Sequence, residues 1–152
     1  MSAIHSRDTK PELMVRKYLW RLGFRFRLNY DRLPGHPDLV LRKYRTCVFV
    51  NGCFWHGHDC PAFRMPKTNV AFWERKIGRN RERDREEKLR LAEMGWHVIE
   101  VWECQLKPAC RKQTLASLAF TLNRIYLQDR SVPYSVLEEE GDWDIAAEPL
   151  PV

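Results

Sequence analysis

Residues 33–60 read LPGHPDLVLRKYRTCVFVNGCFWHGHDC, and this stretch contains the signals that decide the fold. A turn rich in proline and glycine at 33–37 leads into an apolar run at 38–41, and a basic turn separates that run from a second one at 47–50. Two such runs joined by a turn are typical of a β-hairpin. We therefore predict paired strands over these two runs, with the loop 52–60 leaving the end of the second strand.

A helix and a strand precede the hairpin. Thr9 followed three residues later by Glu12 is typical of a capping box, and the apolar residues after it recur on one helical face until Gly23. Residues 24–28 (FRFRL) then alternate between apolar and basic side chains, which predicts a half-buried strand.

Two helices and one strand follow the hairpin. Residues 69–94 have helical character with an expected break near Gly78, and Gly95 should end the segment. Residues 97–102 are expected to form a buried strand, and residues 112–128 an amphipathic helix. The order α-β-β-β-α-β-α predicts an α/β fold in which a small mixed sheet is flanked by helices.

The charge is distributed unevenly along the chain. Residues 1–128 contain 25 Lys and Arg against 13 Asp and Glu, whereas residues 129–152 contain one Arg against seven acids. A basic body of this size favours a polyanionic partner such as nucleic acid, although charged side chains can also serve only to keep a surface soluble. We expect one domain over 1–128, followed by an acidic tail over 129–152 that has few signals for order.

The cysteines indicate a metal rather than disulfides. The first ten residues, MSAIHSRDTK, have no apolar run for a signal peptide, and no segment has the length of a membrane span. We therefore expect a cytoplasmic protein that does not associate with a membrane. In that reducing compartment, clustered cysteines are typical of metal sites.

The loop 52–60 offers three zinc ligands, Cys53, His58 and Cys60. A structural zinc site takes four ligands in a tetrahedron. The fourth could be Cys104, at the end of a predicted strand, or Cys110, in a loop rich in proline and lysine. We favour Cys104 because a rigid element would present it, and four protein ligands predict a structural zinc. The alternative is a set of ordinary thiols with a surface histidine.

Two further residues are candidates for chemistry, His56 and Asp38. If His58 binds the metal, His56 lies two residues away on a stiffened loop and is free to point elsewhere. Asp38 comes at the start of a predicted strand, where a carboxylate beside a main-chain carbonyl of the next strand is suited to Mg²⁺. A lone histidine is more often structural, however, and an aspartate here can also cap a turn.

Several motifs together resemble the very-short-patch-repair (Vsr-type) DNA mismatch endonucleases. They are the turn and acid at 33–38, the strand and loop at 48–60, Phe72-Trp73, Asn80 with Arg83-Asp84, and the stretch 95–104. The likeness runs from about residue 2 to about residue 108. It implies a restriction-endonuclease-like core, with a central mixed sheet between helices. It also implies an enzyme that nicks the thymine strand at T·G mismatches, which arise when 5-methylcytosine deaminates.

The resemblance implies roles for particular residues. Asp38 would bind a catalytic Mg²⁺ together with the main-chain carbonyl of Val50. His56 would act as a general acid or base, and Glu12 would reach the metal-bound water. The structural zinc would be held by Cys53, His58, Cys60 and Cys104.

The resemblance also implies a DNA-contacting surface. Phe54, Trp55 and Trp73 would enter the duplex beside the mismatch, where a mispaired step is easier to open. Lys76 and Asn80, one helical turn apart, would face the DNA near this wedge. From the residues alone, Trp73 could instead belong to the core, and the two polar side chains could be ordinary helix surface.

The sequence departs from the family pattern in three places. Asn51 stands where many relatives carry a histidine, so we expect an auxiliary acid or base to be missing. The N-terminal arm that grips the far side of the DNA is expected to be short or absent. The acidic tail after about residue 129 has no counterpart.

The expected partner is mismatched double-stranded DNA, with mismatch-repair proteins or a cytosine methyltransferase as candidate cellular associates. One active site suffices to nick one strand, so we expect a monomer. Two other functions stay open. One is a restriction-type nuclease of the same fold with another target, and the other is a non-catalytic, zinc-stabilised DNA-binding module.

Overall fold

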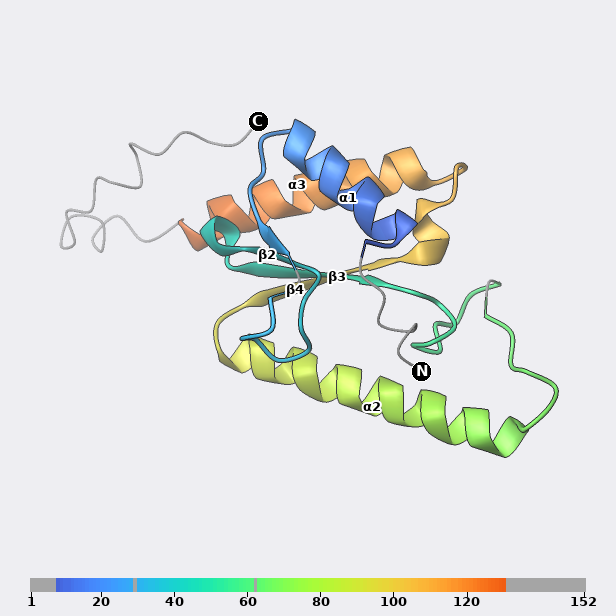
Figure 1. Ribbon diagram of the computed structural model, residues 1–152. Helices are drawn as coiled ribbons and strands as arrows, with labels where there is room; N and C mark the ends of the chain where they lie inside the picture. The colour runs from blue at the N-terminus through green and yellow to red at the C-terminus, as the bar shows by residue number, and fades with distance from the viewer. Residues whose placement is uncertain (1–7, 29, 62, 131–152) are drawn as a thin grey trace.

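The computed structural model describes residues 8–28, 30–61 and 63–130. It contains a four-stranded sheet that lies between helices, with α1 and α3 on one face and α2 on the other (Figure 1). The predicted order of elements and the predicted mixed sheet are confirmed, with two short 3-10 turns added.

The sheet follows the order of the chain, β1-β2-β3-β4. β2 pairs antiparallel with β1 and with β3, so the predicted hairpin is confirmed, and β3 pairs parallel with β4. The parallel pair requires a crossover, which contains α2. The strands are β1 (Arg27–Leu28), β2 (Leu39–Leu41), β3 (Thr46–Asn51) and β4 (His97–Trp102).

The strand expected over 24–28 is reduced to its last two residues, both exposed. The prediction was wrong in extent because Phe24 closes the preceding helix instead of pairing with β2. The Phe24 N–H donates to the Leu19 carbonyl at 3.0 Å, and Gly23, at φ +99°, donates to Trp20. This is a Schellman ending. It places the Phe24 ring in the core, 5.2 Å from the ring of Tyr44.

The helix α1 (Lys10–Arg21) begins where the sequence predicts. The Thr9 hydroxyl accepts a hydrogen bond from the Glu12 N–H at 3.4 Å. The Glu12 carboxylate, however, accepts from the Asp8 N–H at 3.0 Å rather than from that of Thr9, as a full capping box requires. Glu12 is therefore held at the start of α1, and its carboxylate is buried there.

The helix α2 (Val70–Glu93) is continuous, so the expected break near Gly78 is wrong. A side chain at Gly78 would meet nothing within 4 Å, which places this residue on an open face of the helix. Glycine in an exposed helix interior costs roughly 1 kcal/mol relative to alanine, which is too little to interrupt a helix of 24 residues. Gly95 follows the helix at φ +91°, as predicted.

The main core lies between the sheet and the two helices α1 and α3 (Arg111–Asp129). β4 forms one edge of the sheet in the described part of the chain, and Val101 is its one buried residue. The expectation that 97–102 is buried throughout was therefore wrong, because an edge strand has a neighbour on one side only. Cys47 is fully buried in a smaller core on the α2 face.

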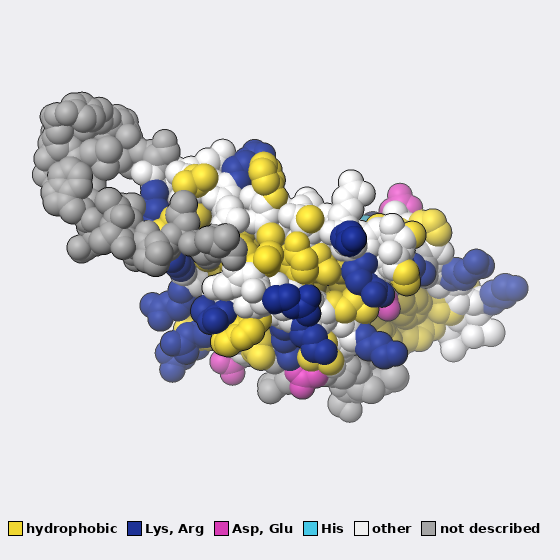
Figure 2. Space-filling view, turned by 90° about the horizontal axis from the view of Figure 1, so that it is seen from above, with side chains coloured by type: hydrophobic (Ala, Val, Ile, Leu, Met, Phe, Trp, Pro, Cys, Tyr) yellow, Lys and Arg dark blue, Asp and Glu magenta, His cyan; other side chains and the backbone are white. Residues whose placement is uncertain are grey.

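Basic side chains are spread over the face that carries α1 and α3, with few acidic ones among them (Figure 2). Within the described ranges, no helix has the length and apolar character needed to cross a membrane. The acidic tail expected over 129–152 starts at the last residue of α3, Asp129, and lies outside the described residues from 131 onward.

Candidate active site and metal cluster

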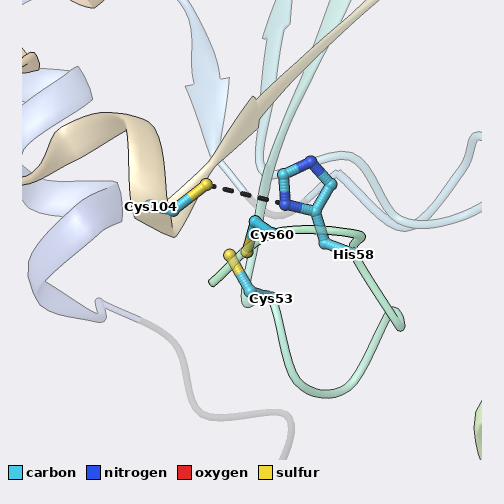
Figure 3. A group of neighbouring side chains, drawn as sticks. All are labelled: Cys53, His58, Cys60 and Cys104. Carbon is cyan, nitrogen blue, oxygen red and sulfur yellow. Dashed lines mark hydrogen bonds between the residues drawn. The ribbon is translucent and has the colours of Figure 1, made fainter. Parts of the chain in front are cut away.

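Four potential metal ligands converge where the loop after β3 meets the turn after β4 (Figure 3). The ligand atoms of Cys53, His58, Cys60 and Cys104 all lie within 4.8 Å of one another. His58 Nδ1 points at Cys104 Sγ, 3.6 Å away. In the part of the chain that the structure describes, this is the one group of three or more Cys, His, Asp or Glu side chains with such spacing.

The cluster fits a tetrahedral ion with sulfur and nitrogen ligands. Ligand atoms around zinc lie about 3.4–3.8 Å apart, given metal–ligand bonds of about 2.0–2.3 Å. Burial raises the pKa of the Cys53 thiol to about 12, so this thiol stays protonated unless a cation displaces the proton. Cys110 is exposed and lies outside the cluster, with its Sγ 3.8 Å from the Cys104 carbonyl. The geometry thus selects Cys104 over Cys110.

The metal side of the loop is attached to β4 and to the 3-10 turn η3 (Glu103–Leu106) that follows it. The Trp102 ring stacks on the His58 ring, with centroids 4.0 Å apart and an interplanar angle of 6°. Glu103 Oε1 accepts a hydrogen bond from the Cys53 N–H at 3.4 Å. These contacts orient the loop without the help of a metal.

The other side of the same loop is attached to α2. His56 Nδ1 pairs with Asp84 Oδ2 at 2.5 Å, and Asn80 Nδ2 donates to the Trp55 carbonyl at 2.9 Å. Asn80 and Asp84 are four residues apart and therefore share one face of the helix. The imidazole of His56 is about one quarter exposed, so it remains accessible while its ring is held in place.

Gly57 allows this close approach. Its φ of +61° favours glycine, and a Cβ built on it would lie 2.6 Å from Cγ2 of Ile77 on α2. Because the loop touches the helix at this point, the ring nitrogens of His56 and His58 on either side of Gly57 are directed to different partners, Asp84 and Cys104. Both rings nevertheless contact the Trp102 ring, so the expectation that His56 points elsewhere holds for its hydrogen bond and not for all of its surroundings.

Asp84 is a candidate functional residue to which sequence reasoning assigned no role. Its carboxylate accepts from His56 Nδ1, which leaves Nε2 as the ring nitrogen that can take up a proton. The signal in the sequence was its spacing of four from Asn80, which predicts a shared helix face. That spacing does not reveal what the face would meet.

Asp38 lies directly before β2, where its Oδ2 accepts a hydrogen bond from the Val50 N–H at 2.7 Å. Burial raises the pKa of Asp38 to about 6. The Val50 hydrogen bond opposes that rise, the negative charge of Glu12 adds to it, and the positive charges of Arg16 and His56 oppose it. The fold therefore brings Glu12 and His56, which are far from Asp38 in sequence, within electrostatic reach of the Asp38 carboxylate.

This corner of the molecule is suited to a divalent cation. The pKa of the half-buried Asp38 carboxylate is raised even though positive charges lie nearby, so a bound cation would further stabilise its ionised form. A hard cation such as Mg²⁺ takes carboxylate and carbonyl oxygens and keeps several waters. Asp38 and the main-chain carbonyl of Val50 are the groups on neighbouring strands that could hold it.

Asn51 has a structural role. It is buried, and its side-chain amide donates to Glu100 Oε2 at 3.2 Å. Glu100 Oε1 in turn accepts from Lys88 Nζ at 3.1 Å. Asn51 therefore links β3 to β4 and to α2. An amide does not transfer protons near neutral pH, so its position adds no acid or base to the site.

The loop aromatics form a cluster with the start of α2. Ring centroids lie 4.9 Å apart for Phe54 and Trp55, 5.4 Å for Phe54 and Trp73, and 5.7 Å for Trp55 and Trp73. Phe63 and Phe72 extend the cluster, and Phe72 is 48% exposed. Trp73 thus packs on the loop at the surface instead of in the core between sheet and helices.

The two polar residues predicted to face DNA lie beside this cluster on α2. Lys76 is half-buried, one turn before Asn80. Besides its bond to the loop, Asn80 accepts a hydrogen bond from Arg83 Nη2 at 3.0 Å. In the protein described here, the Asn80 side chain therefore positions the loop, and a contact to DNA stays a prediction.

Comparison with known proteins identifies one matching family and several similar proteins. Residues 1–62 match the family described as DNA mismatch endonuclease Vsr. The chain is 50% identical over 115 residues to a type II nicking enzyme of Neisseria meningitidis, which covers 74% of this chain and 82% of that protein. It is 48% identical over 107 residues to the DNA mismatch endonuclease Vsr of Escherichia coli, covering 70% and 69%. A type II nicking enzyme of Xanthomonas oryzae is 45% identical over 106 residues, covering 70% and 78%.

Proposed function

The chain belongs to the Vsr family of DNA mismatch endonucleases, and we propose that it nicks the thymine strand at T·G mismatches in a reaction that requires Mg²⁺. One observation carries the proposal. The carboxylates of Asp38 and Glu12 and the imidazole of His56 share one site, and the same loop carries a half-exposed aromatic cluster. Cleavage chemistry and a means of opening a base step therefore lie side by side.

The cleavage chemistry has three parts, namely metal binding, proton transfer and orientation of the attacking water. Bound by Asp38 and the Val50 carbonyl, Mg²⁺ would polarise the scissile phosphate and lower the pKa of a bound water. His56 is the general acid or base, because Asp84 engages Nδ1 and leaves Nε2 to exchange a proton. The Asp84 carboxylate also stabilises the ring when it becomes positively charged. Glu12 orients the attacking water.

The aromatic cluster supplies mismatch selection. Phe54, Trp55 and Trp73 pack on one another at the surface, so they form a preassembled apolar wedge. Inserting such a wedge unstacks a base step at a cost of a few kcal/mol, and a mispaired step resists less. Lys76 and Asn80 border the wedge and contact the neighbouring DNA. Selection of the mismatch therefore relies on the deformability of the DNA as well as on contacts between protein and DNA.

The Cys53, His58, Cys60 and Cys104 cluster holds a structural zinc. Four protein ligands leave no open position for water or substrate, which is typical of structural sites. The ion ties the loop to the end of β4 and so stabilises the loop that presents His56. This division of roles separates the zinc from the chemistry.

The cellular setting follows from the substrate. The enzyme acts on mismatched double-stranded DNA in the cytoplasm, as a monomer with one active site. Mismatch-repair proteins and a cytosine methyltransferase are the associates expected of an enzyme that corrects deaminated 5-methylcytosine.

A duplex nicking assay tests the proposal. Two duplexes of identical sequence, one with a T·G pair and one with the matched T·A pair, are labelled on one strand at a time and incubated with zinc-loaded protein and Mg²⁺. We expect a nick in the thymine strand of the mismatched duplex alone. No nick is expected without Mg²⁺ or with Asp38→Ala. Equal nicking of both strands, or nicking that does not need Mg²⁺, would refute the proposal.

A second function is favoured by a specific observation, because two of the relatives named above are type II nicking enzymes. A restriction-type activity would cut a matched duplex at a particular sequence. The T·A control in the same assay, extended to plasmid length, detects it. The third possibility, a non-catalytic DNA-binding module, has lost its support, since the chain is a DNA endonuclease by family.

A further inference from the structure

Arg16 lies one helical turn after Glu12 and reaches back to it. Arg16 Nη2 donates to Glu12 Oε1 at 3.1 Å, and Nη1 donates to Asp8 Oδ1 at 2.6 Å. The Arg16 side chain is 12% exposed and that of Glu12 is 7% exposed. The guanidinium therefore holds, inside the protein, the carboxylate that the proposed mechanism places near the attacking water.

Stability alone gives little reason for this pair. An exposed pair four residues apart in a helix contributes little to stability, and burying the pair adds a desolvation cost to both ions. Val15 and Leu19, the neighbouring positions of α1, are fully buried aliphatic residues. Apolar side chains thus pack well against this part of the sheet. A buried ion pair among them is typical of a functional constraint.

The site has an electrostatic need for Arg16. Asp38 and Glu12 repel each other, and the positive charge of Arg16 acts on Asp38 as well as on Glu12. A buried and a half-buried carboxylate without a cation between them would move apart or neutralise. Arg16 keeps the Glu12 carboxylate in place next to Asp38 when no divalent cation is bound.

One donor of the guanidinium is left over. Arg16 Nε is buried and has no hydrogen-bond partner among the described residues. A buried, unpaired donor is rare in proteins and concentrates at functional sites, where the missing partner arrives with substrate or ordered water. The described part of the protein thus supplies hydrogen-bond partners for Nη1 and Nη2 of Arg16, but none for Nε.

We propose that Arg16 is a positioning residue for the nicking reaction, and that it acts by fixing the Glu12 carboxylate in the orientation that reaches the attacking water. The inference rests on the proposed function, because the role of Glu12 is part of that function. In this role Arg16 acts through Glu12 rather than through the phosphate or the metal ligands.

A double-mutant cycle tests the proposal, with Arg16→Met, Glu12→Gln and the double variant compared with the wild-type enzyme in the zinc-loaded state. Methionine keeps the length and volume of the buried stem without the charge. Lys17→Met is the matched control, since Lys17 is the exposed neighbour and loses the same charge. For each protein we measure kcat, KM, melting temperature, zinc content, and DNA affinity in Ca²⁺ in place of Mg²⁺.

We expect Arg16→Met to lower kcat by about 10-fold to 100-fold, the scale of a misplaced catalytic group. DNA affinity in Ca²⁺ should change by less than about threefold, and Lys17→Met should behave as wild type. The double variant should be no slower than Glu12→Gln alone, because Arg16 acts through Glu12. Arg16→Lys should recover part of the rate lost in Arg16→Met, since lysine keeps the positive charge but lacks the planar guanidinium that donates two hydrogen bonds at once.

Multiplying effects in the double variant would overturn the proposal, because Arg16 would then act independently of Glu12. Full activity of Arg16→Met or of Glu12→Gln would also overturn it. If Arg16→Met folds poorly, the double variant, which buries no unpaired charge, still supplies the comparison with Glu12→Gln. All rates are measured on whichever duplex the wild type nicks. A wild type without T·G preference therefore refutes the proposed function while leaving the Arg16 result readable.

Discussion

The two sides of the loop 52–60 are held in different ways. On one side, Cys53, His58 and Cys60 meet Cys104 in a cluster suited to one ion. On the other side, the loop rests on the helix α2 through single hydrogen bonds, of which the His56–Asp84 pair is the shortest. Residues that alternate along one short loop therefore depend on unrelated parts of the fold.

This difference between the two sides suggests how a surface loop is made stiff enough for catalysis. A metal held by the four ligands would close the loop onto the turn after β4 and restrict the loop backbone more strongly than hydrogen bonds do. The contacts to α2 then set the direction of one imidazole within that restricted backbone. If this division is correct, substitutions on the two sides should give different phenotypes, and the following predictions test it.

The largest effect should come from the metal side. Cys104→Ala removes one of four ligands, so we expect loss of zinc and a large fall in melting temperature, because metal binding contributes folding free energy directly. Metal analysis and thermal unfolding of the purified protein measure both. Cys110→Ala is the control, since this exposed thiol lies outside the cluster, and it should retain about one zinc per chain. Zinc loss in the control instead would identify the wrong fourth ligand.

A selective loss of activity should come from the α2 side. His56→Ala should lower the nicking rate on the order of 100-fold or more, the usual scale for a lost acid or base. Zinc content and melting temperature should stay near the wild-type values, because His56 hydrogen-bonds to Asp84 and is not one of the four clustered ligands. His58→Ala is the comparison, with rate, zinc and melting temperature all falling together. A His56→Ala protein that loses zinc would show that the two sides are one unit.

A smaller effect is expected for Asp84→Asn. The amide keeps the size of the side chain but loses the charge that stabilises the protonated imidazole of His56. We expect a fall in nicking rate of about 10-fold to 100-fold, smaller than for His56→Ala, with unchanged zinc content. Combining the two substitutions should add nothing to His56→Ala. A double variant that is slower still would give Asp84 a second function.

The smallest effect concerns stability at the Asp38 corner. The pKa of Asp38 is raised to about 6 in the folded protein from its usual 3.8, so the folded state binds more protons between these values. Metal-free protein should therefore lose stability as pH rises from about 4 to about 6, and keep that loss above 6. Asp38→Asn should remove this dependence. The raised pKa corresponds to about 3 kcal/mol at about 1.4 kcal/mol per pKa unit, and the partial exposure of Asp38 reduces it, so the variant should gain roughly 1–2 kcal/mol of stability at pH 7.5, as thermal unfolding in chelator would show. If Asp38→Asn is instead less stable than the wild type at pH 7.5, burial does not destabilise the ionised Asp38 carboxylate, and the prediction is wrong.

Much of the fold follows from local signals. The hairpin 38–50 has a proline-glycine turn before it and apolar runs on either side of a basic turn, and these signals agree with the pairing of β2 and β3. The failures occur where tertiary context overrides a local rule. Gly78 was expected to break a helix, yet the helix is continuous because the open face there tolerates glycine. Phe24 was expected in a strand, yet it completes the end of α1.

The sequence by itself determined which chemical groups are present and which ligands lie close together along the chain. Cys53, His58 and Cys60 share one loop, so their convergence required no knowledge of distant contacts. The choice of Cys104 over Cys110 could be favoured in advance because a strand end is a more rigid support than a loop.

Only the tertiary structure decided how distant groups are combined. Asp84 meets His56 because α2 crosses beneath the loop, and the charge of Arg16 acts on Asp38 because α1 packs on the sheet. Such contacts join residues separated by more than 20 positions, and they depend on helix placement within a few ångströms. Sequence periodicity shows which face of a helix a residue occupies, but only the packing of that helix decides which group lies opposite. The physical reason is that pKa, orientation and accessibility are properties of the surroundings, which the fold creates.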